Sequence, residues 1–272
     1  MIILAATPIG NLSDASPRLI EHLSKARFIA AEDTRSTLKL AGMLGVKLQA
    51  KMFSLNEQNE ESRLEQLVAL AADEDLLVVS DAGMPTVSDP GFLLVRAAVA
   101  AGVEVVVIPG PSAVVSALAV SGLPTDRFTF EGFLPRKTGD RRRLFGQLIA
   151  ERRTMVFFEA PHRILECLED AKSVFGSERR ATVSRELTKK FEQTARGTLA
   201  DLVDWAKSEP KGEMVLVIAG APEETLEIGD LVSEVVRLTG SGLRLKQAVA
   251  EVAGLHGVSK SELYQASLDS RN

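Results

Sequence analysis

The 272-residue chain has one cysteine and three histidines, and this scarcity excludes several kinds of chemistry. A lone cysteine forms no internal disulfide and cannot build a cysteine-rich zinc site. Cys167 lies close to Ile164, Leu165 and Leu168, which predicts an inert thiol on a buried helix face. The histidines are widely separated, so no metal site is expected. Such cysteine usage is typical of a reducing compartment, and we expect a cytoplasmic protein.

Long hydrophobic runs are missing as well. No apolar segment approaches the ~20 residues that cross a bilayer. The chain enters a strand-like run at once, without the basic region and cleavage site of a secretion signal, so we expect neither a membrane protein nor a secreted one. The common nucleotide-binding, zinc-hydrolase and serine-hydrolase signatures are also absent. With 45% hydrophobic and 25% charged residues, the composition is that of a globular protein long enough for two domains.

Three loops rich in proline and glycine are the most informative feature that is present. They span residues 7–12, 80–85 and 109–113, and each follows a short apolar run, at 2–5, 76–79 and 105–108. A helix-compatible stretch comes after each loop. This repetition predicts an open α/β sheet, whose ligands bind outside the carboxyl ends of the strands. The three loops are therefore expected to build a small-molecule site.

Carboxylates lie at the edge of this expected pocket. Asp81 follows a strand and precedes Gly83, so it either accepts hydrogen bonds from a ligand or caps a turn. We favour the ligand role, because Gly83 and Gly110 both permit close backbone approach. Two denser polar clusters, 32–35 and 184–192, also follow strands. They are either surface salt bridges or the walls of a polar cleft between domains, and their position favours the cleft.

Basic residues gather between positions 136 and 153, although the net charge of the chain is −5. The segment has two acidic residues, Asp140 and Glu151, and seven basic ones: Arg136, Lys137, Arg141, Arg142, Arg143, Arg152 and Arg153. It is either a solvated loop and helix face or a patch that contacts phosphates. Composition alone does not decide between the two.

The pattern of apolar runs divides the chain into three parts. Residues 1–122 read as repeated strand–helix units, and residues 123–225 as a mixed α+β domain with longer strands. Residues 226–272 look helical and resemble a helix-turn-helix around Gly257. A small capping bundle without a nucleic-acid role is the alternative for this last part. We favour it on composition, because few residues there are basic.

Eight motifs, in order along the chain, resemble those of the ribosomal RNA small subunit methyltransferase I family, within the tetrapyrrole-methylase-like superfamily of S-adenosylmethionine enzymes. Each motif alone means little, but the ordered set is highly specific. The motifs are 7–12 (TPIGNL), 31–35 (AEDTR), 80–83 (SDAG), 109–112 (PGPS), 131–135 (EGFLP), 162–163 (HR), 185–189 (RELTK) and 211–215 (KGEMV).

The resemblance implies methylation of the ribose 2′-hydroxyl of a cytidine in the decoding region of 16S ribosomal RNA. It also implies a two-domain α/β methylase fold, S-adenosylmethionine bound between the domains, a homodimer and a helix-turn-helix-like C-terminal extension. By similarity, the residues expected to contact the cofactor are Pro8, Asp81, Gly83, Met84, Ser112 and Ala113, with Phe158 and Met214 from the second domain.

A ribose hydroxyl is a poor nucleophile until its proton leaves, so a nearby base, or a cation beside the oxygen, would assist the reaction. Glu186 as base and Lys189 as cation are the first candidates, and Asp33 with Arg35 the second. Phosphate contacts are expected from Arg136, Lys137, Arg141, Arg142 and Arg143. Two other functions remain open: a small-molecule methylase of the tetrapyrrole-precursor type, and a non-catalytic RNA-binding assembly factor.

Overall fold

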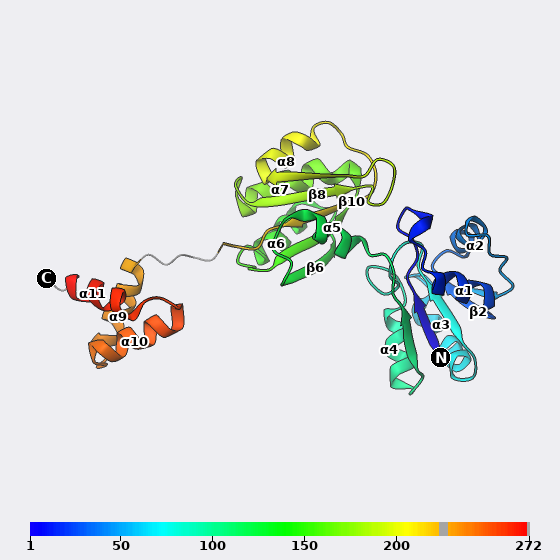
Figure 1. The fold of residues 1–272 in the computed structure, drawn as a ribbon, viewed down its shortest axis with the longest axis horizontal. Coiled ribbons are helices and arrows are strands. Elements are labelled where there is room, and N and C mark those ends of the chain that lie inside the picture. Colours follow the sequence, from blue (N-terminus) through cyan, green and yellow to red (C-terminus); the bar gives the residue numbers. More distant parts are fainter. Residues whose placement is uncertain (223–227, 271–272) are drawn as a thin grey trace. The chain divides into compact units, whose positions relative to one another are not determined.

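The computed structural model describes residues 1–222 and 228–270 of the chain (Figure 1). They form two compact units, Met1–Ala221 and Pro222–Asn272. The first unit holds two five-stranded sheets, and the described part of the second is helical. The boundary expected between residues 225 and 226 lies outside the described residues.

The first sheet is parallel throughout, with strand order β3-β2-β4-β1-β5. Parallel sheets are buried on both faces, which explains why the four residues of β4, Leu-Leu-Val-Val, are all buried. The strands are β1 (Ile2–Ala5), β2 (Phe28–Ala31), β3 (Lys51–Ser54), β4 (Leu76–Val79) and β5 (Val105–Ile108), and the connecting helices are η1 (Leu12–Asp14), α1 (Pro17–Lys25), α2 (Thr34–Met43), α3 (Glu60–Asp73) and α4 (Phe92–Ala100).

Helices cover both faces of this sheet. On one face, Leu67 of α3 and Leu94 of α4 pack in a single apolar cluster with Leu76. On the other face, Leu19 and Leu23 of α1 pack with neighbouring strand residues. The carboxyl ends of the strands stay uncovered by these helices. The loops that the sequence singles out all start there.

The second sheet has the order β6-β7-β10-β8-β9, with β6 parallel to β7 and the other pairs antiparallel. One face is covered by three helices, which form the largest apolar cluster of the protein with the strands, Cys167 included. The elements are β6 (Phe128–Phe133), α6 (Thr138–Gln147), β7 (Thr154–Glu159), η2 (Pro161–Arg163), α7 (Ile164–Phe175), β8 (Arg180–Arg185), β9 (Gln193–Thr198), α8 (Leu199–Ala206) and β10 (Met214–Ile218).

Helix α5 (Ala113–Ser121) connects the two sheets. It follows β5 of the first sheet, yet Val114, Ala117 and Leu118 pack against Val156 and Val217 of the second. Its small, smooth face permits close packing on either sheet. A division after residue 122 therefore separates α5 from the sheet that it covers, and the structure does not support that boundary as a limit between independent cores.

The second unit contains α9 (Ile228–Gly240), α10 (Leu245–His256) and α11 (Lys260–Asp269). Gly257, with a φ of 67°, ends α10 and turns the chain into α11, as the sequence predicts. Leu231, Val252 and Leu263 belong to the apolar cluster that joins the three helices. None of the helices in the described part of the chain could cross a membrane.

Candidate active site

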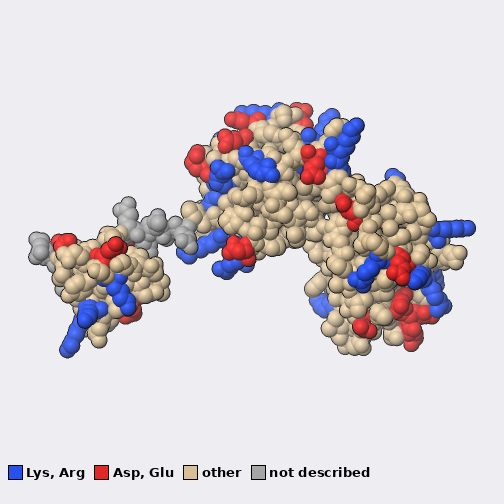
Figure 2. Space-filling view, in the orientation of Figure 1, with Lys and Arg blue, Asp and Glu red and all other residues tan. Residues whose placement is uncertain are grey.

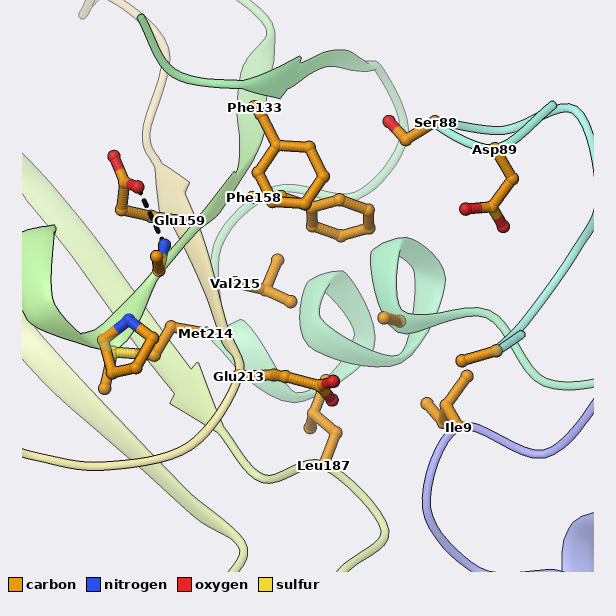
Figure 3. A pocket seen from close by; sticks show the side chains of 14 residues that line it. Ile9, Ser88, Asp89, Phe133, Phe158, Glu159, Leu187, Glu213, Met214 and Val215 are labelled. Carbon is orange, nitrogen blue, oxygen red and sulfur yellow. Dashed lines mark hydrogen bonds between the residues drawn. The ribbon is translucent and has the colours of Figure 1, made fainter. Parts of the chain in front are cut away.

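A cavity of about 360 Å³ lies between the loops of the first sheet and one end of the second (Figure 3). Ile9 comes from the loop after β1, Asp89 from the loop after β4, and Ala113 from the start of α5. The other wall consists of Phe133, Phe158, Glu159, Ala160, Pro161, Leu187, Glu213, Met214 and Val215. A cavity therefore lies where the site was predicted, at the carboxyl ends of the parallel strands.

A smaller cavity of about 60 Å³ adjoins the first. It adds Gly83, Met84 and Ser112 to the wall and shares other residues, Phe158 among them, with the larger cavity. Six of the eight residues expected to contact the cofactor line one cavity or both. They are Gly83, Met84, Ser112, Ala113, Phe158 and Met214.

Pro8 and Asp81 are the two exceptions, since neither lines a cavity. The carboxylate of Asp81 accepts hydrogen bonds from the backbone nitrogen of Asp33, at 3.2 Å, and from the hydroxyl of Ser36, at 3.4 Å. Asp81 thus ties its loop to the start of α2. This is closer to the capping role than to the favoured ligand role.

The loops after β1 and β4 are fixed to each other. Thr7 N donates to Gly83 O at 2.8 Å, and Gly83 N donates to Thr7 O at 3.1 Å. Gly83 has a φ of 87°, a conformation that side chains with a Cβ rarely adopt. A glycine is therefore needed for the two loops to pair beside the cavity.

The loop after β4 reaches the cavity through an unusual backbone path. Thr86 and Ser88 have φ angles of 77° and 61°, in the left-handed region. The buried carboxylate of Glu60 accepts from the backbone nitrogens of Gly91, at 2.9 Å, and Leu94, at 3.1 Å. These bonds anchor the far end of the loop and so hold Asp89 toward the cavity.

The cavity carries negative charge. Its charged lining residues are Asp89, Glu159 and Glu213, and no Lys or Arg is among the described residues that line it. Burial, followed by the nearby Glu32, raises the pKa of Asp89 to about 6. Burial also raises the pKa of Glu159, which lies 3.2 Å from Arg163. Since Asp89 has no cation within ion-pair distance in the described structure, the cavity favours a positively charged ligand.

Glu186 and Lys189 lie at the edge of this cavity, although neither lines it. Lys189 Nζ is 3.1 Å from Glu186 Oε1 and 2.8 Å from Oε2 of Glu213, a lining residue. Desolvation lowers the pKa of Lys189, but the hydrogen bonds to the two glutamates outweigh it and raise the pKa overall. Lys189 is therefore a cation at neutral pH. The second polar cluster borders a cleft, as its position predicts.

Asp33 and Arg35 form a different kind of pair. Asp33 caps α2 by accepting from the backbone nitrogen of Arg35 at 2.8 Å, and its carboxylate binds the exposed guanidinium of the same residue. These hydrogen bonds lower the pKa of Asp33 to about 2. Neither residue lines the cavity, so the first polar cluster contains a local surface pair and not a wall of the cleft.

Arg141 cannot contact RNA, because its side chain is completely buried. The segment expected to be solvated contains helix α6, and Arg141 Nε donates to Asp170 Oδ2 of α7 at 2.7 Å. Arg142 pairs with Asp170 as well, at 2.7 Å, and Arg143 pairs with Asp140 at 3.0 Å. The expected phosphate contact is therefore wrong for Arg141, whereas Arg142 and Arg143 are ion-paired but keep exposed side chains.

Arg136, Lys137 and Arg152 are exposed cations of that segment, and none of the three has an ion-pair partner among the described residues. Figure 2 shows the wider surroundings: on the face drawn, Lys and Arg are interspersed with Asp and Glu over the unit Met1–Ala221.

Two sheets joined by α5, with a carboxylate-lined cavity at the strand ends, are the architecture of tetrapyrrole (corrin/porphyrin) methylases, whose family matches residues 1–203. Solved structures share the fold. The methyltransferase CobJ gives a TM-score of 0.60 at 18% identity, covering 81% of this chain and 94% of that chain, and a diphthine synthase gives 0.58 at 16%, covering 80% and 89%.

Sequence relatives narrow the class to one family. Proteins named ribosomal RNA small subunit methyltransferase I are 46% identical in Mycobacterium tuberculosis and 42% identical in Escherichia coli O157:H7. The matches cover 99% and 98% of this chain and 95% and 94% of the relatives. Residues 228–271 match the RsmI C-terminal HTH domain. The chain belongs to the ribosomal RNA small subunit methyltransferase I family.

S-adenosylmethionine, the methyl donor of these enzymes, fits the two adjoining cavities. It carries a sulfonium and an ammonium, and the unpaired carboxylate of Asp89 is complementary to either charge. Phe158 and Val215 offer apolar surface for its uncharged parts. Gly83 and Ser112 are the lining residues most suited to backbone contacts. The predicted helix-turn-helix resemblance of the last unit agrees with the match to the RsmI C-terminal HTH domain.

Asp89, Glu213 and Phe133 are the lining residues that sequence reasoning missed. Asp89 precedes Pro90-Gly91, a turn signal like those of the chosen loops, and this signal could have found it. Glu213 directly follows Gly212, whose φ is 96°, but its link to Lys189 spans 24 residues. Phe133 belongs to the motif 131–135, but nothing in the sequence indicates that its ring lines a cavity.

Proposed function

We propose that this chain transfers a methyl group from S-adenosylmethionine to the ribose 2′-hydroxyl of a cytidine in the decoding region of 16S ribosomal RNA. The observation that carries the proposal is the near-full-length similarity to proteins named ribosomal RNA small subunit methyltransferase I. The cavity supports it, because it is large enough for a small ligand and complementary to a cationic one.

Bound S-adenosylmethionine supplies an activated methyl group on a positively charged sulfur. The protein's part is then to orient the two reactants, exclude water and manage one proton. In this proposal Glu186 accepts the proton of the hydroxyl, and Lys189 stabilises the developing negative charge on the oxygen. Glu213 lines the cavity and accepts a hydrogen bond from Lys189, so it connects the Glu186–Lys189 pair to the cavity wall.

Methylation of purified small ribosomal subunits with radiolabelled S-adenosylmethionine tests the function, with nuclease mapping of the labelled nucleotide. Label on the ribose of a 16S cytidine is the expected result. Cofactor binding without labelled RNA would favour a small-molecule methylase. Absence of both would leave an RNA-binding assembly factor.

The affinity for S-adenosylmethionine is expected to depend on the carboxylate of Asp89. Asp89→Asn removes the unpaired carboxylate and should weaken S-adenosylmethionine binding about tenfold at pH 7, or ~1.4 kcal/mol. Because the pKa of Asp89 is about 6, wild-type affinity should be constant down to about that pH. It should fall at lower pH, where the protonated carboxyl no longer attracts a cation. The variant should show a flat profile from pH 7 to pH 5 by calorimetry.

Asp126→Asn is the control for that variant, since Asp126 is exposed and lies outside both cavities. Burial disfavours the ionised form of Asp89, so its folded-state pKa lies above the ordinary value of 3.8. The charge thus destabilises the folded protein at pH 7, and Asp89→Asn should not lower the melting temperature. An unchanged affinity in a folded variant would contradict the role.

RNA contact is expected from Arg136 and Lys137, with lesser parts for the paired Arg142 and Arg143. Replacing Arg136 and Lys137 together by alanine should weaken binding to small subunits. It should also reduce the slope of log K against log salt by about 1.5, since each phosphate contact contributes ~0.7–0.9. The exposed pair Lys39 and Lys47, changed to alanine together, provides a charge-matched control. Equal slopes for the two double variants would contradict the assignment.

The chain is further proposed to act in the cytoplasm as a homodimer. β5 is one of the two edge strands of the first sheet, and Val107 on it is 49% exposed. Val99 of the adjacent helix α4 is 64% exposed. Such apolar surface beside an uncovered strand edge favours contact with a second copy. Sedimentation of the purified chain measures the oligomeric state.

A further inference from the structure

A solvent-exposed aromatic side chain lies at the entrance of the larger cavity. Phe133, the last residue of β6, is 64% exposed although it lines the cavity. Its ring meets that of Phe158 edge to face, with 5.3 Å between ring centroids (Figure 3). Phe158 touches Phe130 in the same way, at 4.9 Å. One side of the Phe133 ring is therefore supported by aromatics, while much of it faces solvent.

A β-bulge gives Phe133 this position. Residues three apart on a regular strand point to opposite faces, so Phe130 and Phe133 would not both reach Phe158. The register of β6 against β7 shifts between these two residues, and Gly132 between them has a φ of 71°. The extra residue turns Phe133 to the side of Phe158. The exposure of the ring is thus built into the strand.

Two arginines bind the backbone of the residues directly after Phe133. Arg163 Nη2 donates to the carbonyl oxygens of Leu134, at 2.9 Å, and Pro135, at 2.8 Å. The buried Arg141 Nη1 donates to Pro135 O at 3.4 Å. Leu134 itself is buried. Phe133 therefore projects from a fixed backbone, and the unpaired cations Arg136 and Lys137 follow within four residues.

Phe158 lines both cavities, whereas Phe133 lines only the larger one, together with Ser88 and Asp89 of the loop after β4. The smaller cavity contains Gly83, Met84 and Ser112. A ring at the open mouth, rigidly held and next to free cations, suits the unstacked base of a single-stranded nucleotide.

We propose that Phe133 is the stacking platform for the base of the nucleotide whose ribose is methylated. The proposal rests on the proposed function, since it presumes an RNA substrate. Stacking one face of the base on the ring would leave the ribose free to point into the cavity, toward the cofactor. It would also offset part of the cost of taking that base out of its own stack.

Phe133→Ala tests the platform. Its affinity for small ribosomal subunits and its single-turnover rate at limiting subunits should fall about tenfold to a hundredfold. The dissociation constant for S-adenosylmethionine should stay within about twofold of wild type. Phe133→Trp should retain activity and Phe133→Leu should not, because leucine is apolar but has no aromatic face. Phe128→Ala, at the other exposed end of β6, is the control.

Three results would overturn the proposal: an equal loss of S-adenosylmethionine affinity, which would assign the ring to the cofactor; a loss of dimers on sedimentation, which would assign it to an interface; and unchanged RNA binding. The wild-type chain reports separately on the proposed function. If it methylates no small subunit, both proposals fail, and if it does, the Phe133 variants decide the platform alone.

Discussion

Replacing Asp170 by alanine is expected to destabilise the unit Met1–Ala221 by about 3–5 kcal/mol, the usual cost of leaving a buried charge unpaired. The Asp170 side chain is 4% exposed and binds two arginines, one of them the fully buried Arg141. Without this carboxylate, the fully buried Arg141 guanidinium keeps only the longer ion pair with Glu166, at 3.8 Å. At this size, such a loss corresponds to a fall of roughly 10 °C in melting temperature.

The only tryptophan of the chain makes the measurement direct. Trp205 packs against the apolar cluster that also contains Phe145 of α6 and Leu168 of α7. Its fluorescence in urea therefore reports on the unfolding of this region. Asp140→Ala removes the partner of the exposed Arg143 and should change the stability by less than about 0.5 kcal/mol. A similarly small effect of Asp170→Ala would contradict the buried pair.

A double variant separates the effect of the two buried charges from the effect of the side-chain volume. Arg141→Met with Asp170→Leu removes both charges and keeps apolar bulk in the site, so it should be more stable than Asp170→Ala alone. It should still bind RNA less well than wild type, because Arg141 also donates to the carbonyl oxygen of Pro135 beside the proposed platform. In the double variant, the free energy of unfolding would then recover toward the wild-type value, whereas the affinity for RNA would not.

The cofactor loops could be predicted because their signals are local. Runs of Ile, Leu and Val predict buried parallel strands, and the glycines and prolines after them predict tight turns. The edge strands β3 and β9 escaped notice, since Lys51–Ser54 and Gln193–Thr198 contain few apolar residues. An edge strand is only partly buried and can be polar. Helix α2 was not predicted either, because the polar residues 32–35 at its start were interpreted as a cluster of charges.

The missed parts of the site depend on contacts between distant segments. Arg141 looks like a surface cation in sequence, and only the approach of Asp170, 29 residues away on α7, explains its burial. Asp89 enters the cavity because Glu60, some 30 residues earlier, fixes the end of its loop. The face on which α5 packs is also a tertiary property, because its small side chains are compatible with either sheet. No local pattern contains this information.

Lys189→Ala and Glu186→Gln are expected to slow single-turnover methylation about a hundredfold or more, the range of positioned acid–base and charge-stabilising groups. The reason lies in their geometry. Lys189 is bound to both Glu186 and Glu213 and keeps its proton at neutral pH, so it can stabilise a developing alkoxide but cannot act as the base. Glu186 is therefore the proposed proton acceptor of the pair. Binding of S-adenosylmethionine should change little in either variant.

Lys190→Ala is the matched control for Lys189, because Lys190 is the next residue, exposed and directed over the Phe191 ring. It should retain near-normal rates under rapid-quench conditions with saturating subunits and cofactor. Near-normal rates in both Lys189→Ala and Glu186→Gln would move the proton acceptor to another carboxylate of the cavity.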